Sequence, residues 1–376
     1  MRKLAIIGAS YLQAPLIEKA KKDGIETHVF AWECGDVGEK LADFFYPISI
    51  IEKELILEKC REIEIDGICS IASDLAMITV NYVAQNMGLT SNSMECTKIS
   101  TNKHYMRERF FECGDPSPSS YMVENLDDVK GINLSFPAIV KPLDRSGSRG
   151  ITKVYSENEL ENAIECAKAE GFDKHALVEE FAEGDEYSVE YISWKGKHQF
   201  LAMTKKYTTG SPHFIETGHI QPAPVSEKVL EKIKEIVPHA LDSLMIEYGA
   251  THTELKIDSN DNIKIIEIGG RMGGDFIGSS LVELSTGYDF VQAVIDVALG
   301  VEPRCLSLNE NNAAAVKFIF NEDDVIKYNE IKKAYPKMLV DSSFTEEFDH
   351  EVVDSSTRYG YYIMKTENVN DLLDLL

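Results

Sequence analysis

The chain has 376 residues, of which 44% are hydrophobic and 27% are charged, proportions typical of a soluble globular protein. A chain of this length predicts two or three domains rather than one core. The net charge of −25 argues against nucleic acid or an anionic membrane as the main partner, because phosphates would be repelled.

Seven cysteines are scattered along the chain and form no Cys-x-x-Cys pair, which predicts reduced thiols in a cytoplasm. The apolar residues 3–8 predict a buried first strand rather than a signal peptide. No apolar run approaches the roughly 20 residues that span a bilayer. We therefore expect a cytoplasmic protein without membrane segments.

Strands and helices alternate over the first hundred residues. We expect strands at 3–8, 27–31 and 67–72 and helices at 14–22, 51–60 and 74–87. This alternation predicts a parallel sheet with right-handed crossovers. The first turn, residues 8–13, lacks Gly-x-Gly-x-x-Gly, so this Rossmann-like domain is not expected to bind a dinucleotide.

The pattern changes near residue 100. A helix is expected from Asn102, and a small α+β unit follows, with strands at 136–142, 151–155 and 176–181 and a helix at 158–170. Next we expect a β-hairpin over 185–200, a long ordered loop over 207–224, and an amphipathic helix over 225–248 interrupted at Pro238. A helix at 288–299 and strands within 312–376 complete the chain.

Residues 144–150 form a Gly/Ser-rich loop whose backbone N–H groups can turn toward anionic oxygens. No Walker A motif is present, but Lys141 stands at the end of the preceding strand. Lys103 begins a helix, an unfavourable place for a cation, which points to an anionic partner there. An ordinary turn and a surface lysine remain the alternatives.

The strand over 176–181 leads into an acidic turn. A strand end offers one carbonyl and one N–H in line, which is what the edge of an adenine needs. Glu186 lies far enough along to accept hydrogen bonds from ribose hydroxyls. An exposed acidic turn without function is the alternative.

Two glutamates on a predicted antiparallel hairpin carry the strongest signal. The turn 258–262 reverses the chain, and the resulting register sets Glu254 nearly opposite Glu267, close enough for both to hold a hard cation. Arg271 follows beside two glycine pairs. Two carboxylates and an arginine suit Mg²⁺ and a phosphoryl group better than zinc. The alternative is a solvated hairpin whose charges have no role.

Taken in order, these pieces resemble the ATP-grasp ligases, a superfamily that includes biotin carboxylase, D-alanine–D-alanine ligase, purine-pathway carboxylate–amine ligases and L-amino acid (dipeptide) ligases. The resemblance covers about residues 1–305. It implies an α/β protein with the ATP-grasp fold. The implied domains are an N-terminal Rossmann-like domain (1–100), an ATP-grasp domain (101–305) with a lid at about 116–185, and a C-terminal α+β subdomain (306–376).

The resemblance also implies roles for individual residues. The implied ATP contacts are Lys103, Lys141, Ser146, Gly147, Ser148, Glu179, Glu180, Phe181, Ala182 and Glu186. Glu254 and Glu267 would ligate Mg²⁺, with Mn²⁺ as an alternative, and Arg271 would stabilise the transferring phosphoryl group or the tetrahedral intermediate. Gly269 stands where the family usually has an asparagine, which leaves open whether one metal ion binds or two.

Residues 213–222 and 271–275 resemble the L-amino acid ligase branch most. That branch implies substrate contacts at His213, Glu216, His219 and Arg271. The spacing His213-x-x-Glu216-x-x-His219 also raises a zinc site as an alternative, although Pro212 and Gly218 argue against a shared helical face. A loop that hydrogen-bonds to itself is a third interpretation.

The function implied is an ATP-dependent carboxylate–amine ligase that forms an acyl phosphate and releases ADP and phosphate, with ATP as co-substrate. We expect small-molecule carboxylate and amine partners, amino acids in particular, and a homodimer as one option for assembly. One rival is an enzyme like glycinamide ribonucleotide synthetase, biotin carboxylase or carbamoyl phosphate synthetase. Residues 70–93 contain no lysine or arginine, which weighs against a ribose-phosphate substrate. A second rival is a catalytically silent ATP-binding module.

Overall fold

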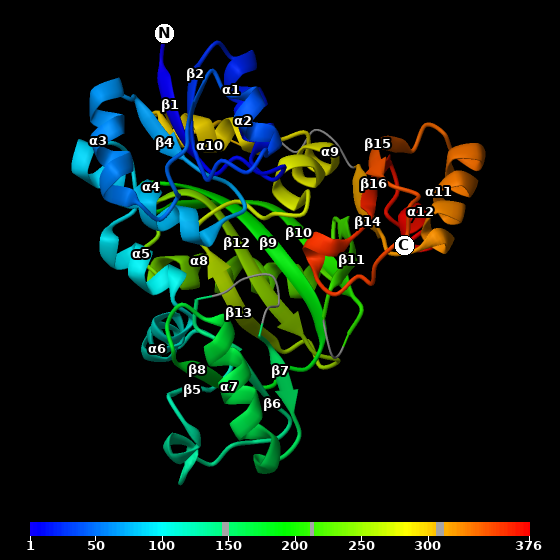
Figure 1. Cartoon of the computed structure of the whole chain (residues 1–376). Helices are drawn as coiled ribbons and strands as arrows, with labels where there is room; N and C mark the ends of the chain where they lie inside the picture. Colours follow the sequence, from blue (N-terminus) through cyan, green and yellow to red (C-terminus); the bar gives the residue numbers. More distant parts are fainter. Residues whose placement is uncertain (145–149, 211–213, 306–311) are drawn as a thin grey trace.

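Three β-sheets organise the computed structural model, which describes residues 1–144, 150–210, 214–305 and 312–376 (Figure 1). An N-terminal unit lies at one end, a large central sheet runs through the middle, and a small unit lies at the other end. The C-terminal residues form an arm at the side of the central sheet.

The N-terminal unit is a parallel four-stranded sheet in the order β3-β2-β1-β4, flanked by helices. Its elements are β1 (Lys3–Ile7), α1 (Ala14–Lys22), β2 (Glu26–Phe30), α2 (Val37–Leu41), β3 (Phe44–Tyr46), α3 (Lys53–Ile63), β4 (Gly67–Cys69) and α4 (Asp74–Met87). Ser73 begins α4 as expected, since its hydroxyl accepts a hydrogen bond from the Ala76 N–H. The predicted parallel arrangement is confirmed.

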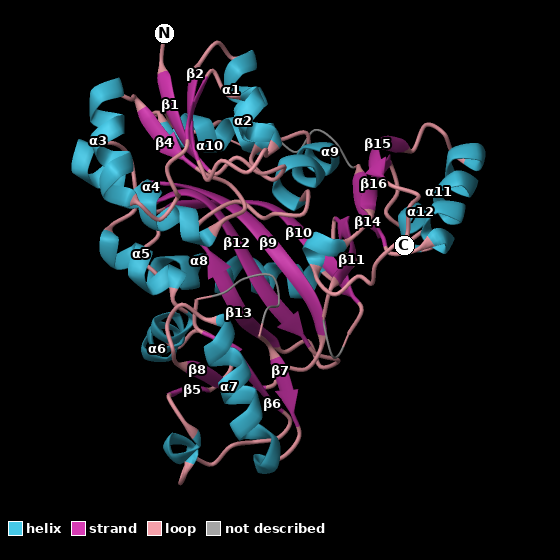
Figure 2. Cartoon of the chain, in the orientation of Figure 1, coloured by secondary structure: helices cyan, strands magenta, loops and turns pink. Residues whose placement is uncertain are grey.

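The central sheet has eight strands in the order β13-β12-β9-β10-β11-β14-β16-β15, and its described pairings are antiparallel. The strands are β9 (Asp185–Trp194), β10 (Lys197–Thr208), β11 (Glu216–Gln221), β12 (Tyr248–Ile257), β13 (Ile263–Gly269), β14 (Ala313–Ile319), β15 (Leu339–Phe344) and β16 (Gly360–Thr366). The pairing of β11 with β14 makes the sheet continuous into the C-terminal arm. Figure 2 shows β9, β10, β12 and β13 running through the middle of the molecule and β14, β15 and β16 in the arm at its side.

Two sequence expectations about this region are wrong. The segment 207–224 is not one long loop, because β10 extends to Thr208 and β11 occupies Glu216–Gln221. The helix expected over 225–248 is α8 (Glu227–Ser243), which ends earlier and continues through Pro238. Its apolar stripe packs against the sheet, and this tertiary packing outweighs the local cost of the proline.

The small unit is a second four-stranded sheet, ordered β5-β8-β6-β7, with α7 against it. Its elements are β5 (Ser120–Val123), β6 (Ala138–Pro142), β7 (Thr152–Val154), α7 (Leu160–Glu170) and β8 (Ala176–Glu180). The remaining helices are α5 (Met94–Thr101), α6 (Lys103–Cys113), α9 (Val282–Thr286), α10 (Phe290–Ala298), α11 (Glu322–Ala334) and α12 (Asn370–Leu373), with short turns at Leu126–Val129, Glu157–Glu159, Ile277–Leu281 and Ser355–Thr357.

Strand alternation gives the central sheet two different faces. On β9 and β12 the odd-numbered residues, such as Val189 and Leu255, pack in one core cluster with α8. The even-numbered residues, such as Glu190 and Glu254, point to the opposite face. The sheet therefore has one apolar face and one mixed face. On the mixed face Ile192 and Ala250 pack with the core of the N-terminal unit, and the polar residues near Glu190 and Glu254 form a platform. In the described part of the chain, no helix is both long and apolar enough to cross a membrane.

Candidate active site

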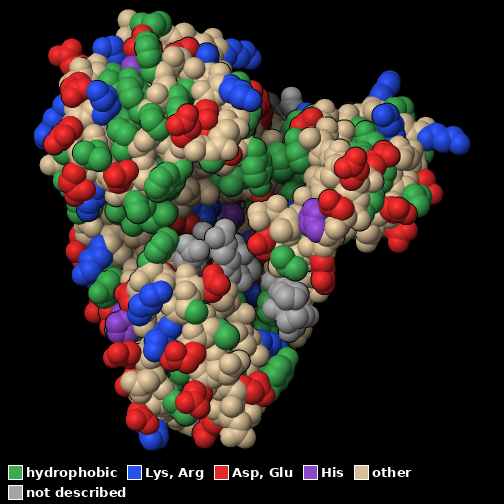
Figure 3. Space-filling view, viewed as in Figure 1, with side chains coloured by type: hydrophobic (Ala, Val, Ile, Leu, Met, Phe, Trp, Pro, Cys, Tyr) green, Lys and Arg blue, Asp and Glu red, His purple; other side chains and the backbone are tan. Residues whose placement is uncertain are grey.

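A cavity of about 460 Å³ lies over the platform of the central sheet, where the three units meet. It is lined from the N-terminal unit, the small unit, the sheet and the C-terminal arm. Its lining residues include Tyr11, Asp74, Lys103, Lys141, Glu186, Lys206, Glu216, His219, Glu254, Glu267, Arg271, Asp275 and Ser355. In the space-filling view a hollow opens between the upper body, the lower unit and the arm, with basic and histidine side chains at its floor (Figure 3).

The predicted pairing of the two hairpin glutamates is confirmed. Glu254 on β12 lies directly opposite Glu267 on β13, and both side chains line the cavity. The register shifts immediately after Glu254, so the pair stands at an irregularity of the hairpin. Bulges of this kind re-aim side chains next to functional sites.

Lys206 is the cation at the centre of the platform. Its ammonium lies 2.7 Å from Glu254, 3.1 Å from Glu186 and 3.6 Å from Glu216. Burial alone would lower the pKa of Lys206, but the three carboxylates raise it well above its ordinary value. Burial would likewise raise the pKa of Glu254, yet Lys206 and His252 hold it well below the ordinary value. Lys206 was not predicted from the sequence.

Lys103 and Arg271 each pair with a carboxylate from another element. The Lys103 ammonium donates to Glu267 Oε1 at 2.8 Å. The Arg271 guanidinium donates from Nε and Nη2 to the two oxygens of Asp74 in the N-terminal unit, at 3.0 and 2.9 Å. A Cβ atom at Gly269 would lie 2.6 Å from Asp74 Oδ1. The Asp74–Arg271 pair therefore occupies the space into which an asparagine at position 269 would project.

Lys141 shares one buried carboxylate with an arginine. Its ammonium lies 2.5 Å from Glu179 Oε2, and Arg107 Nε lies 2.7 Å from Glu179 Oε1. All three side chains are buried. Burial would raise the pKa of Glu179, but the Arg107 guanidinium and the Lys141 ammonium hold it below the ordinary value. Arg107, on α6, had no signal in the sequence.

The remaining expected ATP contacts are only partly assembled by the described residues. Glu186 lines the cavity, whereas Glu179, Glu180, Phe181 and Ala182 do not. The Glu180 carboxylate pairs with Lys264, and the Lys153 ammonium lies 3.5 Å from the centroid of the Phe181 ring. Three further expected contacts, Ser146, Gly147 and Ser148, lie outside the described residues.

The expected substrate residues Glu216 and His219 lie on β11. Glu216 Oε2 accepts a hydrogen bond of 2.8 Å from the Ser355 hydroxyl in the C-terminal arm. His219 is 1% exposed, and neither ring nitrogen has a hydrogen-bond partner among the described residues. Burial, and then the neighbouring Lys206 and Arg358, lower the pKa of His219 well below its ordinary value, so the ring is neutral near pH 7. His213 lies outside the described residues.

The charged side chains that line the cavity include oxygen ligands of the kind that a divalent cation binds. Seven carboxylates and four lysine or arginine side chains line the cavity in the described part of the chain. Those residues contain no group of three or more histidine, cysteine, aspartate or glutamate side chains arranged to hold a metal ion. Glu254 and Glu267 offer two carboxylates, which suits Mg²⁺ held also by phosphate oxygens and water. Glu254 and Glu267 would therefore fit a Mg²⁺ ion whose remaining ligands came from water or from a bound anion.

A buried histidine connects the hairpin of Glu254 and Glu267 to the turn that carries Arg271. His252 Nδ1 lies 2.5 Å from Glu190 Oε1, and the Gly273 N–H donates to Glu190 Oε2 at 3.1 Å. Burial lowers the pKa of His252, but Glu190 and Glu254 together raise it to about 9. A Cβ atom at Gly273 would lie 2.7 Å from His252 Nδ1, so only glycine fits there without displacing the ring.

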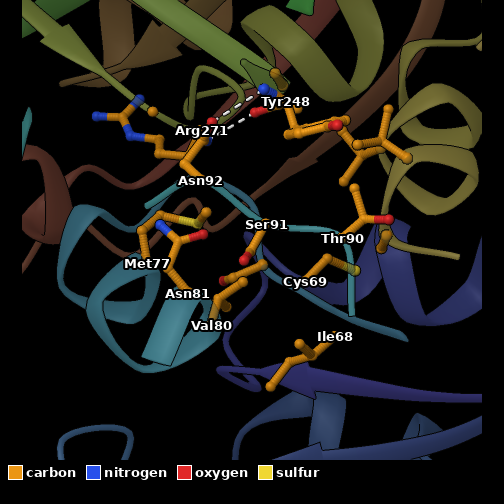
Figure 4. Close-up of a pocket in the computed structure, with 17 residues that line it drawn as sticks. Ile68, Cys69, Met77, Val80, Asn81, Thr90, Ser91, Asn92, Tyr248 and Arg271 are labelled. Carbon is orange, nitrogen blue, oxygen red and sulfur yellow. Dashed lines mark hydrogen bonds between the residues drawn. The ribbon is translucent and has the colours of Figure 1, made fainter. Parts of the chain in front are cut away.

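A second, much smaller cavity of about 50 Å³ lies behind Arg271, between the N-terminal unit and the central sheet. Figure 4 shows the Arg271 guanidinium directed away from it. At its edge Asn92 donates to the Tyr248 carbonyl at 2.8 Å and accepts from the Tyr248 N–H at 2.9 Å. These bonds fix the N-terminal unit to the start of β12, the strand of Glu254.

Comparisons with known proteins agree with this architecture. The family model described as "ATP-grasp domain" matches residues 134–279. Alanine–anticapsin ligase of Bacillus subtilis is 26% identical over 297 residues, which cover 70% of this chain and 62% of that protein. The chain thus spans less than two thirds of the first curated relatives that it matches.

Two solved structures share the fold over the whole chain. The L-amino acid ligase of Bacillus licheniformis has a TM-score of 0.83 at 22% identity, covering 100% of this chain and 95% of that one. The phosphoribosylglycinamide synthetase of Anaerococcus prevotii has a TM-score of 0.78 at 22% identity, covering 99% and 96%. Residues 134–279 thus match the ATP-grasp domain, and the chain as a whole has the ATP-grasp fold.

Proposed function

We propose that this chain is an ATP-dependent carboxylate–amine ligase that releases ADP and phosphate. The observation that carries the proposal is the cavity in which two cross-strand glutamates, the lysines at 103 and 141, and one arginine converge. Phosphoryl transfer needs positioning and charge neutralisation more than a nucleophilic side chain, and this set supplies both.

The proposed reaction has two steps. An oxygen of the substrate carboxylate attacks the γ-phosphorus of ATP, the bond from that phosphorus to the β–γ bridging oxygen breaks, and ADP leaves. The nitrogen of an amine then attacks the acyl carbon of the acyl phosphate, the bond from that carbon to the phosphate oxygen breaks, and the amine loses a proton. The products are an amide, ADP and inorganic phosphate.

Residues of the cavity suit these steps. Lys103 and Lys141, which line the cavity, would neutralise ATP phosphates, and Glu186, which also lines it, would accept a hydrogen bond from a ribose hydroxyl. Mg²⁺ held by Glu254 and Glu267 would supply charge neutralisation for the β- and γ-phosphates. Arg271, oriented by Asp74, can stabilise charge on the transferring phosphoryl group.

The substrate end of the cavity supports amino acids as the substrates. Glu216 offers a carboxylate for an ammonium group, and the neutral His219 ring offers one donor and one acceptor nitrogen, both without a protein partner in the described chain. The similarity to an alanine–anticapsin ligase and to an L-amino acid ligase supports the same class.

A ribose-phosphate substrate is less well supported, although a phosphoribosylglycinamide synthetase shares the fold. The described residues that line the cavity from the N-terminal unit are Ser10, Tyr11, Leu12, Ala72 and Asp74, and none of these is a lysine or arginine. From the N-terminal unit a ribose phosphate would meet one carboxylate, Asp74, which already pairs with Arg271, and no lysine or arginine of that unit.

The test is a screen of amino-acid pairs with ATP and Mg²⁺, followed by chromatography of the spent nucleotide. We expect ADP and phosphate in equal amounts, dependent on both amino acids. AMP and pyrophosphate as the sole products would overturn the proposal.

A further inference from the structure

Two side chains one turn apart on helix α6 donate hydrogen bonds to β13, the strand that carries Glu267. Lys103 and Arg107 are four residues apart and so lie on the same face of the helix. Lys103 donates to the Glu267 carboxylate at 2.8 Å, and Arg107 Nη2 donates to the Ile266 carbonyl at 2.6 Å. The helix is thereby fixed to β13 at two adjacent residues, one of them an expected metal ligand.

Arg107 also reaches the small unit. Its Nε lies 2.7 Å from Glu179 on β8, whose other carboxylate oxygen lies 2.5 Å from the Lys141 ammonium on β6. Arg107 therefore joins three elements, α6, β13 and β8. Of the two cations that share Glu179, only Lys141 lines the cavity.

The net charge of the Arg107, Glu179 and Lys141 side chains determines how strongly Lys141 attracts an anion. Two buried cations share one carboxylate, so the group keeps a net positive charge that an anion entering the cavity can meet. Without the guanidinium, Glu179 would have Lys141 as its single cationic partner here, and the two charges would cancel. An ammonium held in a neutral pair attracts a phosphate less than one that shares its counter-ion.

We propose that Arg107 is a positioning residue for Lys141: by pairing with one oxygen of the Glu179 carboxylate and by holding β13 through Ile266, it keeps the Lys141 ammonium available to a nucleotide phosphate in the cavity. This assignment rests on the proposed function, in which Lys141 contacts ATP. Arg107 itself does not line the cavity, so its effect passes through Glu179.

The experiment compares ATP affinity, measured by calorimetry without amino acids, in wild type, Arg107→Met, and the double variant Arg107→Met/Glu179→Gln. Arg107→Met should weaken ATP binding about tenfold, the factor that corresponds to about 1.4 kcal/mol. The double variant should recover to within about threefold of wild type, because the neutral amide that replaces the Glu179 carboxylate no longer holds Lys141. A purely structural arginine would give no such recovery, since the second substitution only removes another buried contact.

The matched control is Arg109→Met on the same helix. Arg109 donates to the Ser243 carbonyl at 2.8 Å and pairs with the exposed Glu112, so it does not touch Glu179. This variant should bind ATP as wild type does. Thermal unfolding of every variant reports whether the fold survives.

If Arg107→Met does not fold, Glu179→Gln alone provides a second test of the proposal. The implied adenine contact of Glu179 is through its backbone, which the substitution keeps. Without the carboxylate that competes for Lys141, this variant should therefore bind ATP at least as tightly as wild type, at a lower melting temperature. Weaker binding in Glu179→Gln, unchanged binding in Arg107→Met, or a double variant no better than Arg107→Met would each overturn the role of Arg107. Absence of ATP binding by wild type would instead refute the proposed function, and this assignment with it.

Discussion

Lys206 is the cation on which three platform carboxylates converge, and replacing it with methionine tests the electrostatics of the cavity. The variant keeps the length of the side chain but leaves Glu254, Glu186 and Glu216 without their shared counter-ion. Removing one partner of a buried ion pair commonly costs about 3–5 kcal/mol, because the remaining charge is uncompensated. These carboxylates keep side-chain exposures of 29%, 22% and 17%, so water screens them in part and the lower end applies.

A loss of about 3 kcal/mol at roughly 2 °C per kcal/mol predicts a fall of about 6 °C in melting temperature. The assay is thermal unfolding in a chelator at neutral pH, with Lys205→Met as control. Lys205 adjoins Lys206 on β10 but pairs with the exposed Asp185, so its loss should cost less than about 1 kcal/mol. Millimolar Mg²⁺ should raise the melting temperature of Lys206→Met more than that of wild type, because Glu254, no longer paired with Lys206, can bind it together with Glu267.

The pH dependence of this difference has a definite sign. The pKa of Glu254 is held well below its ordinary value of 4.5, mainly by Lys206 against the effect of burial. Such a group stabilises the fold above its ordinary pKa, and that stability is lost as the pH falls through the lowered pKa. The gap between wild type and Lys206→Met should therefore shrink below about pH 4.5. An equal gap at pH 7 and below pH 4, or a Lys205→Met variant that is as unstable, would refute this reasoning.

Three further variants test other parts of the site. Glu267→Gln should lower the rate of ADP release about a hundredfold, since about 3 kcal/mol of transition-state stabilisation is lost. It should also raise the Mg²⁺ requirement more than Glu254→Gln does. Activity within about threefold of wild type at limiting Mg²⁺ would exclude the hairpin as the metal site. His219→Ala should raise the KM for amino acids with ATP affinity near wild type, and the reverse pattern would assign β11 to the nucleotide. Gly269→Asn should lower kcat about tenfold or more instead of adding a metal ligand, because its Cβ would lie 2.6 Å from Asp74 Oδ1. A kcat at or above that of wild type would contradict this account.

Sequence analysis was most accurate for features that are set by residues close together along the chain. The five-residue turn 258–262 pairs Ile257 with Ile263, so counting along the hairpin sets Glu254 within one residue of Glu267. The register shift after Glu254, which counting does not predict, brings the two residues directly opposite each other. The alternation of strands and helices before residue 90 also predicted the parallel sheet, because each helix returns the chain so that the next strand runs in the same direction. The assignment of individual ATP and substrate contacts stays a prediction, as do the domain boundaries.

What the sequence did not predict depends on partners far along the chain. Strand β11 looks like a polar loop, yet it is a strand because β10 and β14 pair with it on both sides and its polar residues face a cavity. Lys206 meets Glu254 across 48 positions, and Arg271 meets Asp74 across 197. No local pattern of residues encodes such distances, so these ion pairs became visible only in the fold.

The central claim is that a substrate carboxylate is activated as an acyl phosphate. The most direct measurement uses an amino-acid substrate with ¹⁸O in its carboxylate and determines the mass of the released phosphate. The proposed mechanism predicts that one labelled oxygen is transferred to each phosphate, because the attacking carboxylate oxygen stays with the phosphorus when the amine displaces it. Unlabelled phosphate at full turnover would contradict the acyl-phosphate route and the ligase assignment.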